Sequence, residues 1–240
     1  MTTEDRHFPF EQVGDERLRQ AVQILTTEHF TLQSARGNVI AETNGRLAIY
    51  LGTVSSALIA LAFVGQISGL GEAFHVFALI LLPALLVLGL ATAGRLLQSN
   101  RQDLLYGAGI NRVRHFYVEL VPELGDYFVQ SVHDDFEGGL QSMGLLPRAH
   151  MQQWVSVPVL VAALNALVAG VLAGLLISWV GAVTLPVAVV GGVAVGFVVL
   201  QVEGALGSRA ISRLERFVTP RFPTPPPSRR QTSAAQPARP

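Results

Sequence analysis

Two long apolar stretches decide the fold, and the second of them, residues 155–202, reads VSVPVLVAALNALVAGVLAGLLISWVGAVTLPVAVVGGVAVGFVVLQV. Residues 181–184 divide it into two runs of about 20 residues, the length that a helix needs to cross the hydrocarbon core of a bilayer. Residues 68–72 divide the first stretch, residues 47–97, in the same way. The sequence therefore predicts an all-α fold in which four transmembrane helices form two hairpins.

The overall composition is that of a membrane protein. Of the 240 residues, 50% are hydrophobic and 14% are charged, whereas a soluble domain carries about 25% charged residues. The 17 basic and 17 acidic residues balance, so no net charge indicates a nucleic-acid partner. All the basic residues are Arg, and Cys is absent. A lysine-dependent phosphate loop or Schiff base, thiol catalysis and cysteine-bound zinc are therefore excluded.

The distribution of Arg predicts the orientation of the spans. Arg is absent between Arg46 and Arg95, and again between Arg148 and Arg209, so both hairpin turns lack it. Because cytoplasmic loops are enriched in basic residues, we expect both termini and the central loop in the cytoplasm. Residues 1–46 lack the pattern of a cleavable signal peptide, so span one is expected to direct insertion into the bacterial cytoplasmic (inner) membrane.

The N-terminal segment carries a helical repeat. Leu18, Leu25, Leu32 and Val39 recur every seven residues. This pattern predicts a cytoplasmic amphipathic helix over residues 15–46, which we expect to dock against the rest of the cytoplasmic part.

The remaining segments outside the spans differ in composition. In the central loop, residues 98–154, we expect a helix that continues span two and a second helix from Pro122 to the glycines at 138–139. We expect disorder over residues 1–14 and over the Pro/Arg-rich tail, residues 219–240.

Small residues recur at four-residue spacing in three of the spans, a pattern that lets helix backbones approach closely. They are Gly52, Ser56 and Ala60 in span one, Ala166, Gly170 and Gly174 in span three, and Ala188, Gly192 and Gly196 in span four. We predict helix packing through these rows. Packing within one bundle is the favoured interpretation. Because one bundle does not obviously use all three rows inside, we also expect a homo-oligomer.

Polar residues are scarce within the spans. Asn165 is the one strongly polar side chain deep in a span, and we interpret it as an interhelical hydrogen-bond clip rather than a ligand site. Asp, Glu and Arg are absent at mid-depth, which counts against a proton-coupled transporter.

The segment after span four is basic on one face. Arg209, Arg213 and Arg216 lie opposite an apolar face of a predicted amphipathic juxtamembrane helix, residues 203–218. We expect this helix to lie on the inner leaflet, with its Arg side chains on anionic lipid headgroups.

Two sets of residues in the central loop contain atoms that bind metals. One comprises His133, Asp134, Asp135 and Glu137, and the other comprises His115 and Glu119, four residues apart. Neither has a second ligand cluster at a recognised spacing. We therefore favour a solvated acidic turn and an intrahelical pair, and we predict no metal and no cofactor.

Basic residues lie next to aromatic residues in the first part of the central loop. Arg112 and Arg114 precede the aromatic run at 115–117, and we expect them to contact anionic lipid rather than nucleic acid. A glycine-rich phosphate loop and a serine-nucleophile motif are both missing, so we predict a protein that is not an enzyme.

Two stretches carry a resemblance to known sequences. AETNGR, residues 41–46, leads into a span rich in small residues, and INRVRHFY, residues 110–117, follows the first hairpin. Over residues 20–205 the chain resembles uncharacterised multi-span integral membrane proteins of high-GC actinobacteria, and its exclusive use of Arg suits that source. The resemblance implies a four-span architecture, and it carries no activity or site residues.

Three classes of function follow from these patterns. The favoured one is a non-enzymatic scaffold or interaction protein in the lipid bilayer, with cytoplasmic helices that bind a protein partner. The alternative is an oligomeric channel or pore-forming membrane effector. A membrane-embedded enzyme or transporter comes third, because such proteins usually need polar groups at depth.

Overall fold

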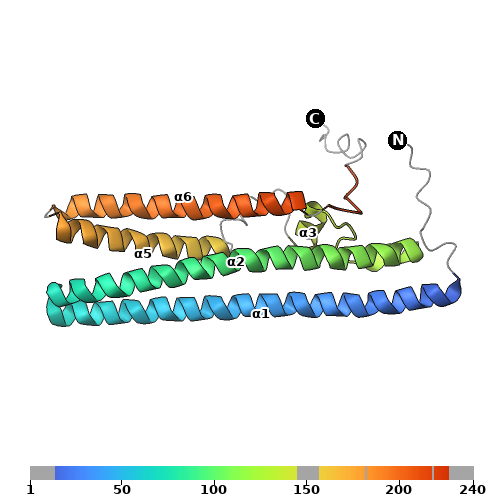
Figure 1. The fold of residues 1–240 in the computed structure, drawn as a ribbon, viewed down its shortest axis with the longest axis horizontal. Coiled ribbons are helices and arrows are strands. Elements are labelled where there is room, and N and C mark those ends of the chain that lie inside the picture. Colours follow the sequence, from blue (N-terminus) through green and yellow to red (C-terminus); the bar gives the residue numbers. More distant parts are fainter. Residues whose placement is uncertain (1–13, 145–156, 182, 218, 227–240) are drawn as a thin grey trace, which may run out of the picture. The chain divides into compact units, whose positions relative to one another are not determined.

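The chain is helical throughout its regular elements in the computed structural model, which describes residues 14–144, 157–181, 183–217 and 219–226, with the backbone alone for 214–217. The helices in chain order are α1 (Asp15–Ser68), α2 (Glu72–Leu120), the 3-10 helix η1 (Pro122–Tyr127), α3 (Phe136–Ser142), α5 (Val157–Val180) and α6 (Leu185–Phe217) (Figure 1). The predicted all-α class is confirmed.

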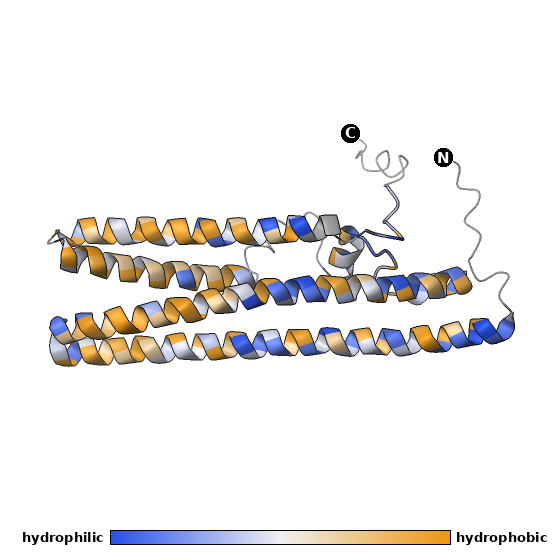
Figure 2. Ribbon diagram, in the orientation of Figure 1, coloured by the Kyte–Doolittle hydropathy of each residue, from blue (hydrophilic) through white to orange (hydrophobic). Residues whose placement is uncertain are grey.

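Four of these helices, α1, α2, α5 and α6, are long and apolar enough to cross a membrane. The hairpin turns fall at the predicted positions, because α1 ends at Ser68 before α2 begins at Glu72, and α5 ends at Val180 before α6 begins at Leu185. In the first turn Gly69 has a φ of 60°, a conformation that glycine adopts without strain. Figure 2 shows hydrophobic residues concentrated along α5 and on the parts of α1, α2 and α6 near the turns.

The chain divides into two compact units. Unit 1 comprises residues 1–32, 107–147 and 218–240, and unit 2 comprises residues 33–106 and 148–217. Helices α1 and α2 contribute to both, since each extends well beyond its apolar part. The predicted N-terminal helix and the first span are thus one continuous helix, which Gly37 and Gly45 do not interrupt.

Unit 2 has an apolar core built from three of its long helices, α1, α2 and α5. Tyr50 of α1, Ala78 of α2 and Val161 of α5 are fully buried there. The other buried members of this core are Val54, Ala57, Leu82, Leu85, Leu96 and Val168. Helices α1 and α2 are also joined by charged pairs, in which Asp103 accepts from Nε of Arg36 at 2.6 Å and Glu42 accepts from Arg95 at 2.7 Å.

In unit 1 the sevenfold repeat of α1 forms the half-buried face of the helix. Leu18, Leu25 and Leu32 are all half-buried, while the residues between them are mostly exposed. Leu32 contacts α2 at Gly109, where an added Cβ would lie 3.0 Å from the Leu32 side chain. The hydroxyl groups of Thr26 and Tyr117 are hydrogen-bonded at 3.1 Å. The repeat therefore packs α1 against the polar end of α2.

The prediction of one helix from Pro122 to the glycines at 138–139 is wrong. The 3-10 helix η1 ends at Tyr127, residues 128–135 are not helical, and α3 begins only at Phe136. The reason is that polar side chains in this segment bond to partners that a helix would not reach. Asp135 accepts from the backbone N–H of Thr224, and Gln130 accepts from Arg114. Asp135 also accepts from the Gly138 N–H, which makes it the N-cap at which the separate helix α3 begins.

Two further expectations need correction at the C-terminal end. The predicted separate helix over 203–218 is instead a continuation of α6, which runs without a break to Phe217 past Gly204 and Gly207. The first part of the tail, residues 219–226, was expected to be disordered and is ordered against unit 1 residues. Residues 1–13, 145–156 and 227–240, which complete the predicted terminal segments and central loop, lie outside the described residues.

Candidate functional site: a carboxylate pair that holds an extended segment

Asp134 and Asp135 of unit 1 lie in the non-helical segment before α3 and bind residues 219–226. Asp134 is completely buried, with 0% of its surface exposed. Its two carboxylate oxygens accept the backbone N–H groups of Arg221 at 3.0 Å and Phe222 at 2.7 Å. Asp135 accepts the backbone N–H of Thr224 at 2.7 Å and the hydroxyl of the same residue at 2.8 Å.

The sequence of the bound segment matches this arrangement of acceptors. Residues 220–226 read PRFPTPP, so only Arg221, Phe222 and Thr224 possess a backbone N–H. All three of these groups donate to the two carboxylates. The prolines also favour an extended backbone before binding, which lowers the entropy lost on ordering the segment. The pair therefore recognises the main chain of a proline-flanked extended segment.

Side chains of α2 hold the carboxylate pair in place. Arg112 forms an ion pair with Asp134 and also donates to the carbonyl oxygen of Thr219 at 3.3 Å. Asn111, which is fully buried, donates to the carbonyl of His133 at 2.8 Å. Its Oδ1 accepts from Arg114 and from Ser142, each at 3.1 Å. This network ties the segment before α3 to α2.

The same hydrogen bonds keep the two carboxyl groups ionised. Burial by itself would raise the pKa of Asp134, but the hydrogen bonds from Arg112 and from the N–H groups of Arg221 and Phe222 outweigh it and lower the pKa. The pKa of Asp135 is also lowered, because the N–H groups of Gly138 and Thr224 outweigh the effect of burial. The site is therefore anionic at neutral pH and suited to backbone donors.

An aromatic contact adds to the binding of the segment. The ring of Phe222 stacks on the imidazole of His115, with centroids 3.8 Å apart and planes inclined by 22°. Such stacking favours an aromatic side chain at this position of the segment. The His115 ring also lies 6.3 Å from the ring of His133, measured between centroids.

The two predicted metal-ligand sets occur close together but have other partners. Asp134 and Asp135 are engaged with residues 219–226, and Nε2 of His115 lies 3.3 Å from Glu119. Within the described part of the chain no group of three metal-ligating side chains is found. The favoured alternative, a solvated acidic turn, is wrong for Asp134, because that residue is buried. The pairing of His115 with Glu119 matches the second expectation.

A second polar cluster lies inside the helical bundle of unit 2. Tyr50 of α1 donates its hydroxyl to Oδ1 of Asn165 at 2.7 Å, and Nδ2 of Asn165 donates to Glu203 of α6 at 3.0 Å. Helix α2 passes the cluster at Gly89, where an added Cβ would lie 1.8 Å from Oδ1 of Asn165. The prediction that Asn165 is an interhelical clip is confirmed.

Sequence reasoning missed the part that Glu203 plays. The residue was assigned to a juxtamembrane helix, whereas α6 continues and places its carboxylate on Asn165. A signal was present, because Glu203 shares a helical face with Gly192 and Gly196, the face that meets α5. Following the helical face of Gly192 and Gly196 to the end of α6 predicts that Glu203 lies toward α5.

Helices α5 and α6 lie side by side (Figure 1). Two of the three small-residue rows pack against each other between them. A Cβ at Gly192 of α6 would lie 2.5 Å from the carbonyl oxygen of Gly170, and one at Gly196 would lie 2.7 Å from that of Ala166. Likewise, a Cβ at Gly174 would lie 3.3 Å from the carbonyl oxygen of Ala188. The row of span one differs. Gly52 and Ser56 are exposed, and a Cβ at Gly52 would meet nothing within 4 Å.

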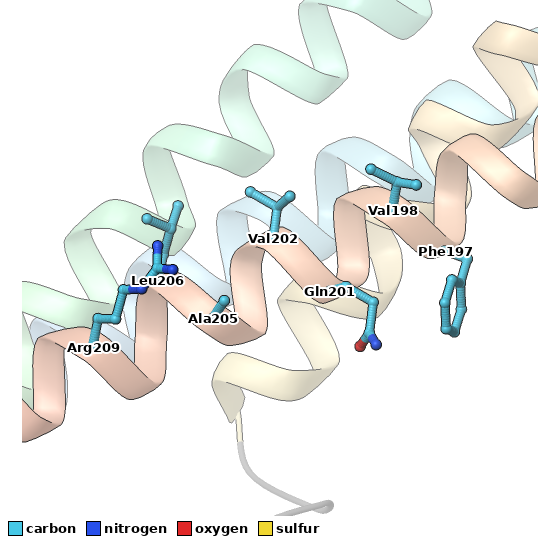
Figure 3. Close-up of a pocket in the computed structure, with 7 residues that line it drawn as sticks. All are labelled: Phe197, Val198, Gln201, Val202, Ala205, Leu206 and Arg209. Atoms are coloured by element: carbon cyan, nitrogen blue, oxygen red, sulfur yellow. The ribbon is translucent and has the colours of Figure 1, made fainter.

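The predicted headgroup-binding Arg residues follow one another along α6. Arg209 and Arg213 are exposed, and Arg216 lies among the residues whose backbone alone is described. Arg209 also ends a shallow depression formed by α6 residues only, which Figure 3 shows running along the helix from Phe197. Its other residues are Val198, Gln201, Val202, Ala205 and Leu206. A surface contributed by one apolar helix is what lipid tails would contact.

Comparison with known proteins gives no further assignment, because no family model, curated protein or solved structure matches the chain.

Proposed function

We propose that the chain is a non-enzymatic integral protein of the bacterial cytoplasmic membrane, in which unit 1 faces the cytoplasm and binds a protein partner. The observation that carries this proposal is a run of exposed apolar side chains between residues 121 and 129, in and beside η1. Tyr127 is 79% exposed and Val129 is 101% exposed, and they are joined by Val121 and Leu124. Exposed apolar side chains gathered on a water-facing unit are typical of protein interaction sites.

The polar groups of the molecule support a structural role rather than catalysis. Asp134, Asp135, Asn111 and Asn165 are all hydrogen-bonded to other parts of the chain. Charged pairs also join α1 and α2, as in Arg36 with Asp103. Side chains engaged in this way join separate segments of the fold, which supports a structural role.

Site-specific photocrosslinking tests the proposal. A benzophenone amino acid at position 129 should give a discrete adduct in living cells, because Val129 is fully exposed in the apolar group. The substitution Tyr127→Ser should reduce this adduct at least fivefold without changing protein level. Position 20 on α1, which is exposed but lies outside the group, is the matched control. Equal adducts from positions 20 and 129, or none from 129, would contradict the proposal.

The orientation has a separate test, which benefits from the absence of Cys in the chain. A single Cys at Leu70 in the first hairpin turn should react with a membrane-impermeant maleimide in intact cells. A single Cys at Tyr127 should react only after the membrane is permeabilised. The reverse pattern would show that the positive-inside argument fails for this chain.

A second candidate is an oligomeric channel or pore-forming effector. The exposed row of Gly52 and Ser56 favours it, since this row has no partner among the described residues and would let a second copy approach closely. Native mass spectrometry in mild detergent tests it, with Gly52→Leu as the variant and Gly204→Leu as the control. A strictly monomeric wild type would exclude the oligomer. If the wild type is oligomeric, ion flux in vesicles would distinguish a channel from a scaffold.

A further inference from the structure

We propose that the carboxylate pair Asp134–Asp135 is a recognition site for extended, proline-flanked peptide segments, and that residues 219–226 are its built-in, exchangeable occupant. A partner protein would displace this occupant with a segment of the same chemistry. The inference deepens the proposed function, because it names the class of partner segment that unit 1 binds.

The contacts show that the site reads main chain rather than a particular set of side chains. Three of the donors to the carboxylates are backbone N–H groups, at residues 221, 222 and 224. In return the N–H of Asp134 donates to the carbonyl oxygen of Phe222 at 3.2 Å. The side chains of Arg221, Pro223 and Pro225 are exposed. A segment from another protein could therefore make the same bonds.

Two features limit which segments would fit. Proline at the flanking positions removes N–H groups that would have no acceptor and keeps the backbone extended. An aromatic residue at the position of Phe222 stacks on His115. The hydroxyl of Thr224 donates to Asp135, so a hydroxyl or another donor is favoured two residues after the aromatic.

The occupant is able to leave without disrupting a helix. Residues 219–226 contain no helix or strand, and α6 ends before them at Phe217. An empty site, however, would expose the carboxylate of Asp134 with Arg112 as its remaining charged partner. Such a site favours rapid refilling by any segment that brings backbone donors. Because the built-in segment is tethered, it competes at an effective concentration of the order of millimolar.

Fluorescence anisotropy with a labelled, end-capped peptide of residues 219–226 tests the inference. The full-length chain is used, in detergent, as the wild type and as the variant Phe222→Ala/Thr224→Pro, which weakens the built-in occupant. The variant should bind the peptide at least tenfold more tightly than the wild type. Adding Asp135→Asn to this variant should weaken binding at least tenfold, whereas Glu137→Gln, in the first turn of α3, should leave it unchanged.

Changes in the peptide test the reading of the main chain. N-methylation at the positions of Phe222 and Thr224 removes two backbone donors and keeps both side chains, and it should weaken binding at least tenfold. Arg221→Ala keeps its backbone donor and should change binding by less than twofold. Equal binding of the N-methylated and unmodified peptides would overturn the proposal, as would equal binding to the wild type and the Phe222→Ala/Thr224→Pro variant.

A second measurement covers the case in which that variant fails to fold. A spin label on Pro226→Cys in the otherwise wild-type chain should become mobile when the unlabelled peptide is added in large excess. A label that keeps its mobility would overturn the proposal. If wild-type chains form dimers in which each tail occupies the site of the other copy, a second copy is the occupant and the external partner is excluded. The photocrosslink from Val129 is independent, so its loss with intact peptide binding would contradict the proposed function alone.

Discussion

The α5–α6 interface of unit 2 and the Asp134–Asp135 site of unit 1 each hold two segments together, but with different chemistry. Between α5 and α6 the contact is backbone against backbone, since Gly170 and Gly192 bring each helix within reach of the other's carbonyl oxygens. At the carboxylate pair the contact is between buried negative charge and backbone donors. The α5–α6 interface should therefore be disrupted by larger side chains, whereas the Asp134–Asp135 site should be disrupted by loss of a carboxylate charge.

The difference reflects the surroundings that each region is suited to. In lipid, apolar side chains gain nothing by leaving the solvent for one another, so close packing has to supply the attraction between helices. In water, a short extended segment buries too little apolar area to stay bound. Charge-assisted hydrogen bonds to a buried carboxylate supply the additional stabilisation that holds such a segment in place. The comparison predicts opposite responses of the two regions to steric and to electrostatic changes.

The largest effect is expected from a steric change at the helix interface. Gly192→Leu would place a side chain where even a Cβ lies 2.5 Å from the Gly170 carbonyl oxygen. We expect it to lower the free energy of unfolding by more than about 3 kcal/mol, measured by reversible unfolding in mixed detergent micelles. Gly204→Leu, also in α6 but with nothing within 4 Å, is the control and should cost little. Equal losses would mean that close packing is not what holds the pair.

A loss of charge should disrupt the carboxylate site. Asp134→Ala removes the acceptor of the Arg112 Nε–H and of the backbone N–H groups of Arg221 and Phe222. Because Arg112 is 41% exposed, we expect a cost of about 2 kcal/mol, below the value for a fully buried pair. Hydrogen exchange should rise over residues 219–226 while α5 and α6 stay protected. Glu137→Ala, an exposed acid of α3, should leave the exchange unchanged.

The hydrogen bonds of Asn165 with Tyr50 and Glu203 should contribute less to stability than the α5–α6 interface or the carboxylate site. Asn165→Leu removes the acceptor of Tyr50 and the donor to Glu203. Hydrogen bonds between helices in membranes are worth about 1 kcal/mol, and we expect a loss of that size in the same unfolding assay. Gln201→Leu changes an exposed polar residue of α6 and serves as the control. A loss above that of Gly192→Leu would show that hydrogen bonding dominates the bundle.

Acidification should release the tail and spare the bundle interface. The pKa values of Asp134 and Asp135 are lowered in the folded chain, so their stabilisation is present above the unfolded value of 3.8. It is lost as the pH falls below that value through the folded pKa. A spin label on Pro226→Cys should stay immobile between about pH 7 and pH 5 and become mobile in stronger acid. Release already at pH 6 would point to groups other than these two carboxylates.

The smallest effect is expected at the exposed row of α1. Gly52→Ala adds a methyl group where nothing lies within 4 Å. It should raise the stability of the monomer slightly, by up to about 1 kcal/mol, because alanine favours a helix over glycine. Unfolding at a protein concentration that keeps the chain monomeric measures this. A loss of stability instead would show that the row packs against another part of the protein.

Much of the fold could be predicted from the sequence alone. The four spans, both hairpin turns and the break between α2 and the next helix at Pro122 followed from the length of apolar runs and from turn residues. Helix α1 followed from its sevenfold repeat. These features depend on local composition and on a periodicity that a single sequence displays. The helix predicted from Pro122 is the exception. Its residue spacing was suitable, but Asp135 bonds to Thr224 and Gln130 bonds to Arg114, outside the predicted helix.

The sequence by itself thus determined that the chain is helical and suited to a membrane, because about 20 consecutive apolar residues have few other stable states. Only the tertiary structure decided which glycine rows meet, that Glu203 joins Asn165, and that Asp134 binds the backbone of Phe222. The physical reason is that these contacts join residues far apart in the chain. A hydrogen bond of this kind depends on where two groups lie in space. The spacing of Glu203 from Gly192 and Gly196 places it on the face that meets α5, but it does not identify the partner residue.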